Sequence, residues 1–362
     1  MWNQTRITQL LGIKYPILLG PMGGGFSTPE LLAAVSNAGG LGSLGAYTLT
    51  PEQLLEAGKS IKNQTDKPYN INLWVSDVDP ELAHYSAESL EKVKALFKPF
   101  YDALSIPLPE LDMNIPSKFD KQVEVLFNIK PAVFSFIFGI PSPEILNEAR
   151  RLGIKTVGAA TTLDEALALE EAKVDAIVAA GFEAGGHRPS FLKPAQDSLT
   201  GTFALVQQLK ARIKTPVIAA GGITDGKGIA AALTLGADAA QLGTAFLVTD
   251  ESNTTPLHKA LLLSEEANYH TVLSKSLTGR MGRMISNTIS KEISNQTPVL
   301  PFPLQTRLLA PLREASLAQG RTDMVNFWSG QNPVRLKLSK AAEVMQALVT
   351  ETQRILEPRA GL

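Results

Sequence analysis

Eight short apolar runs constrain the possible folds of this chain more than any other feature. Each run is followed by a polar, amphipathic segment. The runs are rich in Val, Ile, Leu, Ala and Phe, with little alternation of apolar and polar residues. Such near-continuous apolar strands are typical of a parallel sheet that is covered on both faces. We therefore predict strands at residues 16–21, 41–46, 69–75, 132–139, 155–160, 176–181, 216–222 and 239–247.

The segments between these runs carry the start signals of helices. Thr28-Pro29, Thr50-Pro51 and Ser142-Pro143 each place an N-cap residue before a proline, which has no N–H to leave unsatisfied. Eight strands alternating with helices favour an α/β fold of the TIM (β/α)8 barrel type. A doubly wound open sheet is the main structural alternative. We prefer the barrel because the strand count reaches eight over a suitable length.

The alternation of strands and helices stops near residue 250, which predicts a change of architecture there. We expect the barrel over 1–250, a mostly helical cap or insertion over 251–335, and a C-terminal helix over 336–362 that returns to the barrel. The stretch 76–130 is also long for a connection, and we expect added helices in it.

Composition excludes several classes of protein. With 44% hydrophobic and 19% charged residues, the chain of 362 residues builds a large core. The absence of cysteine excludes disulfides, thiolate metal sites, iron–sulfur clusters and cysteine nucleophiles. Lys and Arg (34) balance Asp and Glu (35), which argues against nucleic-acid binding. No apolar run reaches the ~20 residues of a membrane span, and no signal peptide is evident, so we expect a cytoplasmic protein.

Glycine clusters follow the last two predicted strands, at the face of a barrel where active sites lie. Gly221-Gly222 ends one strand, and Gln241-Leu242-Gly243-Thr244 ends the next. Loops at these two places form the usual phosphate site of such barrels, because backbone N–H groups converge there. Tight turns without a ligand are the alternative for either cluster alone. The two clusters together favour a phosphate site that includes the Thr244 hydroxyl.

His187 follows a glycine pair, Gly185-Gly186, at the end of another apolar strand. The glycines leave room for a flat ligand, and a histidine titrates near neutrality, so His187 is a candidate base, acid or hydrogen-bond donor. No second histidine or carboxylate has ligand spacing with it, so we expect no metal site. The remaining histidines, to which we assign no role, are His84, His258 and His270.

Asn72 is a polar residue inside the otherwise strand-like run 69–75. An amide that points into a barrel needs a hydrogen-bond partner. Its mixed donor and acceptor character suits the edge of a heterocycle, and a hydrogen bond to a neighbouring strand or a buried water is an equal alternative.

Together, these motifs resemble those of the nitronate monooxygenase family, formerly called 2-nitropropane dioxygenases. The histidine and tryptophan strings look like the class I enzymes of bacteria and fungi. The matching strings run from Pro16-Ile17 through Pro21-Met22-Gly23, and continue with Ser27-Thr28-Pro29-Glu30-Leu31, Ala38-Gly39-Gly40-Leu41-Gly42, Asn72, Glu183-Ala184-Gly185-Gly186-His187, Ala220-Gly221-Gly222-Ile223, Gln241-Leu242-Gly243-Thr244, Gly279-Arg280 with Arg283 and Asn287, and Trp328-Ser329-Gly330-Gln331.

This resemblance implies a flavin-dependent TIM barrel with a smaller cap domain and non-covalently bound FMN. His187 corresponds to the catalytic base, and the phosphate site corresponds to that of the FMN 5′-phosphate. The positions expected at FMN are Met22, Gly23, Asn72, Ala180, Gly185, Gly222, Gln241, Leu242, Gly243 and Thr244.

The reaction implied by the resemblance is oxidation of an alkyl nitronate by O2 to a carbonyl compound and nitrite. Propionate 3-nitronate, a toxic metabolite, is the substrate that the family suggests, and the role would be detoxification. We expect small-molecule partners only, no nucleic acid or membrane, and a monomer or homodimer.

Two positions depart from the family pattern. Ala180 stands where a glutamine is often found near the flavin, and Phe302 stands where a tyrosine is common in the substrate pocket. Both departures leave substrate preference open. The sequence also leaves open whether the approach of an anionic substrate is favoured by four positively charged residues, Arg188, Lys227, Arg280 and Arg283. Charged residues on loops are usually solvated.

Two alternative functions use a similar barrel. The first is an FMN-dependent NAD(P)H:quinone or enoyl-thioester reductase, which needs room for a nicotinamide. The second is a flavin-free phosphate-sugar isomerase or aldolase. The second leaves Asn72 and the histidine loop without a task, and no predicted strand ends in the lysine that a Schiff-base aldolase needs.

Overall fold

Eight parallel strands form the centre of the molecule, as the apolar runs predict. The computed structural model describes residues 1–332 and 338–357. The strands are β1 (Ile17–Leu19), β2 (Gly42–Gly45), β3 (Tyr69–Trp74), β4 (Val133–Ile137), β5 (Lys155–Ala160), β6 (Ala176–Ala180), β8 (Val217–Ala220) and β9 (Ala239–Leu242). Their order in the sheet is β1-β9-β8-β6-β5-β4-β3-β2.

The sheet closes on itself between its two outer strands. Leu18 bridges to Leu41 in parallel, and the Leu41 carbonyl oxygen accepts from the Leu19 N–H at 2.9 Å. The predicted (β/α)8 barrel is therefore confirmed, and the open-sheet alternative is wrong. The last strand is shorter than predicted, because the chain turns at Gly243 and starts helix α10 (Thr244–Leu247).

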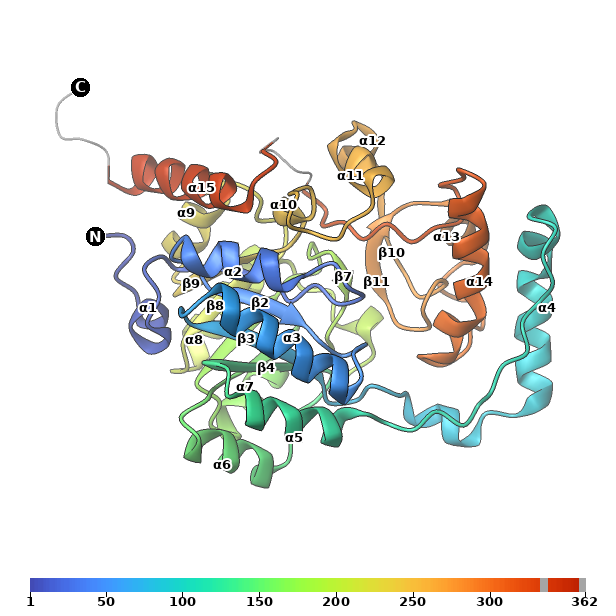
Figure 1. Cartoon of the computed structure of the whole chain (residues 1–362), viewed down its shortest axis with the longest axis horizontal. Coiled ribbons are helices and arrows are strands. Elements are labelled where there is room, and N and C mark those ends of the chain that lie inside the picture. Colours follow the sequence, from blue (N-terminus) through green and yellow to red (C-terminus); the bar gives the residue numbers. More distant parts are fainter. Residues whose placement is uncertain (333–337, 358–362) are drawn as a thin grey trace.

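A ring of helices covers the outside of the barrel (Figure 1). The predicted threonine and serine N-caps are confirmed, with Pro29, Pro51 and Pro143 at the first helical positions. The helices of the ring are α2 (Pro29–Asn37), α3 (Pro51–Gln64), α5 (Phe119–Ile129), α6 (Pro143–Arg151), α7 (Leu163–Glu171), α8 (Thr202–Arg212), α9 (Gly226–Thr234) and α15 (Ala341–Leu356). A short helix, α1 (Arg6–Leu11), precedes β1.

A second apolar core lies beside the barrel, at the right of Figure 1. Residues 82–104, with α4 (Ala87–Ala103), share this core with residues 277–324, and we call these two segments the second lobe. The elements around its core are η1 (Pro80–His84), β10 (Thr271–Ser274), β11 (Gly282–Ile285), α13 (Thr288–Glu292) and α14 (Leu304–Ala318). Helices α11 (Pro256–Leu263) and α12 (Glu266–Tyr269) pack in a separate apolar cluster that also contains Leu247 and Val248.

A small antiparallel sheet connects the two bodies. Its order is β10-β11-β7, and β7 (Gly186–His187) belongs to the loop after β6, which also contains η2 (Ala195–Asp197). The domain boundaries at residues 250 and 335 stay a prediction, and part of the expected C-terminal segment, 336–337 and 358–362, lies outside the described residues. Within the described residues, no helix has the length and apolar character needed to cross a membrane.

Candidate active site at the carboxyl ends of the strands

Small and polar side chains form the upper layer of the barrel interior. Ala159, Ala180 and Ala220 belong to the inner apolar cluster, near the carboxyl ends of β5, β6 and β8. Alternation along β9 turns Gln241 inward as well, and turns Leu242 outward into the helix-facing core. Together with Asn72 of β3, these inward-pointing residues close the barrel interior below its carboxyl-terminal mouth, and we call this surface the barrel floor. Ala180 contributes a methyl group there, so this floor can accept a flat ring.

Asn72 is held by the neighbouring strand and still has an unused acceptor. Its Nδ2 donates to Ser135 Oγ at 2.9 Å, and Asn70 donates to the same oxygen at 2.9 Å. This is the structural alternative that the sequence left open. The Asn72 Oδ1 has no hydrogen-bond partner among the described residues, so it is available to accept from a ligand on the floor.

The predicted phosphate loops border the floor on one side. Gly221 and Gly222 have φ values of +123° and +69°, which L-residues rarely adopt. After β9, Gly243 leads into Thr244, whose Oγ1 accepts from the Gly330 N–H at 2.9 Å. The structure thus brings the glycine turns of two neighbouring strands next to the serine-glycine-glutamine string at 329–331.

The glycine positions at this rim fit tightly around other backbone segments. A Cβ on Gly185 would lie 2.6 Å from Gly330 N, and a Cβ on Gly23 would lie 2.3 Å from the Tyr47 ring. Gly243 is more open, because among the described residues a Cβ there would meet only Met22, with Sδ at 3.7 Å. Glycine is therefore required at the first two positions for packing, while the Gly243 backbone can be approached by a ligand.

The N-terminus of α9 is not open to the predicted phosphate. Asp225 accepts from the Gly228 N–H at 2.9 Å, and Glu351 of α15 accepts from the Gly226 N–H at 2.8 Å. Two carboxylates already satisfy the first turn, so a phosphate there would meet negative charge. The backbone of the two glycine turns and Thr244 remain as donors for the predicted phosphate.

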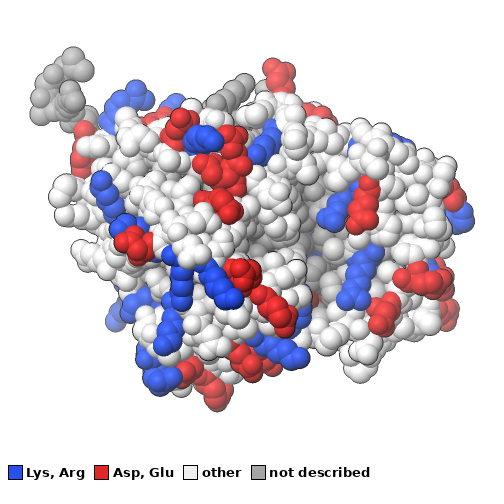
Figure 2. Space-filling model, viewed as in Figure 1, with Lys and Arg blue, Asp and Glu red and all other residues white. Residues whose placement is uncertain are grey.

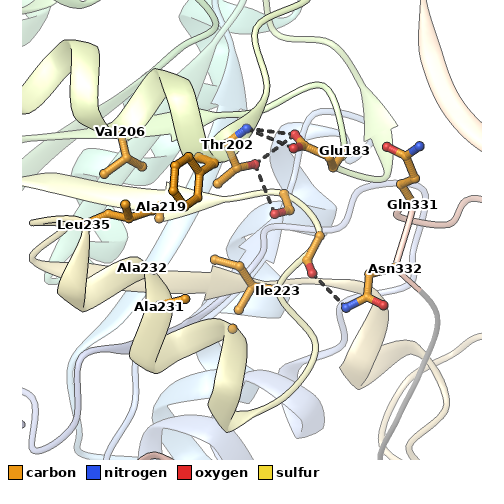
Figure 3. A pocket seen from close by; sticks show the side chains of 14 residues that line it. Glu183, Thr202, Val206, Ala219, Ile223, Ala231, Ala232, Leu235, Gln331 and Asn332 are labelled. Carbon is orange, nitrogen blue, oxygen red and sulfur yellow. Dashed lines mark hydrogen bonds between the residues drawn. The ribbon is translucent and has the colours of Figure 1, made fainter. Parts of the chain in front are cut away.

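A cavity of about 380 Å³ adjoins the Gly221–Gly222 turn on its outer side (Figure 3). It lies between α8 and α9, and most of its lining is apolar, with Val206 and Ile223 among the lining side chains. Glu183 faces it with its carboxylate already bound to Thr202 N and Oγ1. His187 is not part of its lining, so this cavity is separate from the reactive side of the site.

His187 lies within a group of aromatic rings. Strand pairing with Gly282 of β11 fixes its backbone, and the ring is half-buried. Four rings, which we call the aromatic cage, surround it at centroid distances of 4.8–6.4 Å. They are Trp74, Phe138, Phe302 and Trp328.

The environment keeps the imidazole of His187 neutral. Desolvation among the rings, followed by the positive charge of Arg280, lowers its pKa from 6.5 to about 3. At neutral pH the ring therefore has a free lone pair and can accept a proton. Its Nε2 lies 2.9 Å from the Thr278 hydroxyl oxygen.

Arg280 lies over the same rings and is paired with a carboxylate. Its guanidinium carbon is 4.2 Å from the Phe138 ring centre and 4.6 Å from that of Phe302. The Asp79 Oδ1 lies 2.6 Å from Arg280 Nη2, and Asp79 Oδ2 accepts from the Phe302 N–H at 2.7 Å. This ion pair ties the loop after β3 to the loop that carries Phe302.

The usual expectation that charged residues on loops are solvated is wrong for the three arginines of this site. Arg188 and Arg283 are 2% and 4% exposed, and Arg280 is also largely buried. Arg188 donates to the carbonyl oxygens of Ala180 and Ser198, so it holds the loop after β6. Of the four charged residues in question, Lys227 is exposed.

Sequence reasoning did not assign a role to Trp74, Phe138 or Thr278, which contact or surround His187. The available signal was positional. Trp74 and Phe138 stand at the carboxyl ends of two barrel strands, where a site is expected. Thr278 belongs to the Gly/Arg-rich string at 278–283, which no rule of spacing places beside His187.

Comparison with known proteins agrees with this geometry. The family model of nitronate monooxygenase matches residues 4–351. A protein of Staphylococcus aureus (strain Newman) named "probable nitronate monooxygenase" is 37% identical over 360 residues, which are 99% of each chain.

Two solved structures are similar over nearly the whole chain. A nitroalkane oxidase from Streptomyces ansochromogenes has a TM-score of 0.87 at 33% identity, with 96% of this chain and 98% of that chain covered. FabK from Thermotoga maritima has a TM-score of 0.75 at 28% identity, with 98% and 97% covered. Flavin dependence is typical of the matched family, whose members are oxidoreductases. With a family match across the barrel and the second lobe, and close relatives along its full length, the chain belongs to the nitronate monooxygenase family.

Proposed function

We propose that this enzyme oxidises alkyl nitronates with O2, using FMN, and produces a carbonyl compound and nitrite. The observation that carries the proposal is the position of His187, a neutral base within an aromatic cage beside a floor of small side chains. Propionate 3-nitronate is the substrate we propose, and its removal is the proposed role. Location in the cytoplasm and a monomeric or dimeric state remain predictions.

The residues at the floor fit a flavin mononucleotide. The free Asn72 Oδ1 is an acceptor for an N–H at the edge of a heterocycle, and the alanine methyl groups allow a flat ring to approach. The backbone at Gly222, Gly243 and Thr244 would hold the 5′-phosphate. Met22, Gly23, Gly185 and Gln241 complete the proposed set, and Leu242 would contribute only backbone because its side chain faces the helices. When bound, the flavin supplies the electron-accepting chemistry of the reaction.

His187 acts on the substrate carbon in the proposed reaction of a neutral nitroalkane. The imidazole takes the proton from the carbon next to the nitro group, and the C–H electron pair becomes the C=N bond of the nitronate. A base with a pKa of about 3 is weak in the free protein. The negative charge that forms on the nitro oxygens offsets this, because it stabilises the imidazolium beside it.

An anionic nitronate needs no proton transfer and would instead be held by hydrogen-bond donors. Arg280 is paired with Asp79, so the two side chains add no net charge to the cage. On the face shown in Figure 2, charges of both signs are scattered around the hollow between the barrel and the second lobe. We therefore expect orientation of the substrate by the cage rather than long-range attraction.

Anaerobic stopped-flow absorbance tests the proposal. The purified flavin-loaded protein is mixed separately with propionate 3-nitronate and with NADH. We expect loss of the oxidised-flavin absorbance with the nitronate and none with NADH, followed by nitrite production when O2 is admitted. A colourless protein that binds no added FMN would contradict the cofactor assignment.

A reductase that uses NAD(P)H and the same cofactor is the second candidate. The likeness to FabK from Thermotoga maritima, at a lower TM-score than the nitroalkane oxidase, is the observation that favours it. Rapid bleaching of the flavin by NADH alone, without reaction of the nitronate, would select this function instead.

A further inference from the structure

The hydroxyl of Thr278 forms two hydrogen bonds with different partners. Its Oγ1 lies 3.0 Å from the carbonyl oxygen of Arg280 and 2.9 Å from Nε2 of His187. Thr278 is 4% exposed, so neither contact is readily replaced by bulk water. The direction of these two bonds decides which nitrogen of His187 carries the proton.

A carbonyl oxygen can only accept, so the single hydroxyl proton of Thr278 is directed at Arg280. If that proton pointed at His187 instead, two oxygens without a proton between them would face each other at 3.0 Å. Such a buried, unsatisfied contact is costly. The Thr278 oxygen therefore accepts from His187, which requires the proton on Nε2.

The geometry points to Thr278 as the positioning residue that fixes the tautomer of His187, with Nε2 protonated and Nδ1 as the proton-accepting nitrogen. This inference rests on the proposed function for its catalytic meaning. Nδ1 has no hydrogen-bond partner among the described residues, and so has a free lone pair. In the proton transfer, the substrate C–H bond breaks, an Nδ1–H bond forms, and the C–H electron pair becomes the C=N bond of the nitronate.

Backbone contacts hold Thr278 and His187 close to each other. His187 pairs with Gly282 at the start of β11, two residues after Arg280. Gly279 has a φ of +89°, and a Cβ there would lie 2.5 Å from the Leu300 carbonyl oxygen. The turn therefore rests directly on the loop before Phe302. The hydrogen bond persists when His187 is protonated, because Nε2 remains a donor in the imidazolium.

Nitrogen-15 NMR of histidine-labelled, flavin-loaded protein tests the tautomer directly. The chain has four histidines, and His187→Gln identifies the signals of His187 by their loss. We expect a protonated Nε2 and an unprotonated Nδ1 in the native protein and in Thr278→Ser. In Thr278→Val, which cannot accept, we expect the proton to move partly or wholly to Nδ1.

Steady-state kinetics supply the second measurement. We expect Thr278→Val to lower kcat/KM for a neutral nitroalkane by about tenfold or more, while Thr278→Ser and the preformed nitronate stay near native values. A protonated Nδ1 in the native protein overturns the inference, as does an unchanged tautomer in Thr278→Val, whatever its nitroalkane rate. If the native protein oxidises no nitronate, the proposed function fails, while the NMR spectrum still decides the tautomer. If Thr278→Val does not fold, the native and Thr278→Ser spectra decide it.

Discussion

The barrel floor and the aromatic cage both lie at the carboxyl ends of the barrel strands, but they are built in different ways. The floor consists of small or amide side chains at the ends of barrel strands, with backbone of the glycine turns at its rim. The cage consists of large rings, two from the ends of β3 and β4 and two from residues 302 and 328. This division agrees with the proposed roles, in which the floor holds the cofactor and the cage selects and activates the substrate.

Removal of the His187 ring is the sharpest way to separate the two parts. We expect His187→Ala to retain flavin, since the floor is untouched. Turnover of a neutral nitroalkane should fall about 10²–10⁴-fold, the usual contribution of a general base. Turnover of the anionic nitronate should fall much less, because its proton is already gone. Equal rates of native protein and variant on the nitroalkane would exclude His187 as the base.

Substitution of Asp79 tests how much the Asp79–Arg280 ion pair contributes to the stability of the aromatic cage. Asp79→Asn leaves the guanidinium without its charge partner in a largely buried place, and we expect a loss of about 2 kcal/mol in unfolding free energy. The control is Glu88→Gln, which removes an exposed pair with Lys92 on α4 and should cost about 0.5 kcal/mol or less. Urea unfolding measures both losses. Equal losses would show that the buried Asp79–Arg280 pair contributes no more to stability than the exposed Glu88–Lys92 pair.

Acidification tests the buried state of His187. Its folded pKa of about 3 lies below the ordinary 6.5, so the unfolded chain binds more protons between these values. The contribution of His187 to the free energy of unfolding is therefore fully present above pH 6.5. It is lost as the pH falls towards 3, by up to about 1.4 kcal/mol per pH unit for this one proton. His258, whose pKa burial lowers to about 4, adds to the same slope.

His187→Gln provides the comparison for this pH dependence. The variant should unfold in urea with a shallower dependence on pH between 6.5 and 4 than the native flavin-free protein. Parallel pH curves for the two proteins would mean that the ring is not desolvated in the fold.

Substitution at the rim of the floor gives the smallest expected effect. Gly222→Ala places a Cβ at a φ of +69°, 3.3 Å from the Glu183 Cβ, and we expect flavin affinity to fall about five- to tenfold. Gly153→Ala is a matched control, because its φ is +75° and its added Cβ meets no atom of the described residues within 4 Å. Both variants should lose roughly 1 kcal/mol of stability from backbone strain, and only the first should lose flavin affinity. Flavin fluorescence titration measures that difference.

Local signals in the sequence predicted the barrel and its rim well. Each apolar run became a strand, because buried parallel strands need continuous apolar residues. Thr50 forms the N-cap of α3 together with Gln53, and glycines at 221 and 222 adopt positive φ where the chain must turn. These features depend on neighbours a few residues away, and the residue types alone express them.

The sequence by itself therefore determined the strands, the helix starts, the glycine turns and His187 as the distinctive side chain among them. Only the tertiary structure decided that Thr278, 91 residues away, touches His187, and that Phe302 and Trp328 close the cage around it. It also decided that Arg188 and Arg283 are buried and that α4 packs with residues 277–324. The physical reason is that packing and desolvation depend on which distant segments meet, and no local periodicity encodes that meeting.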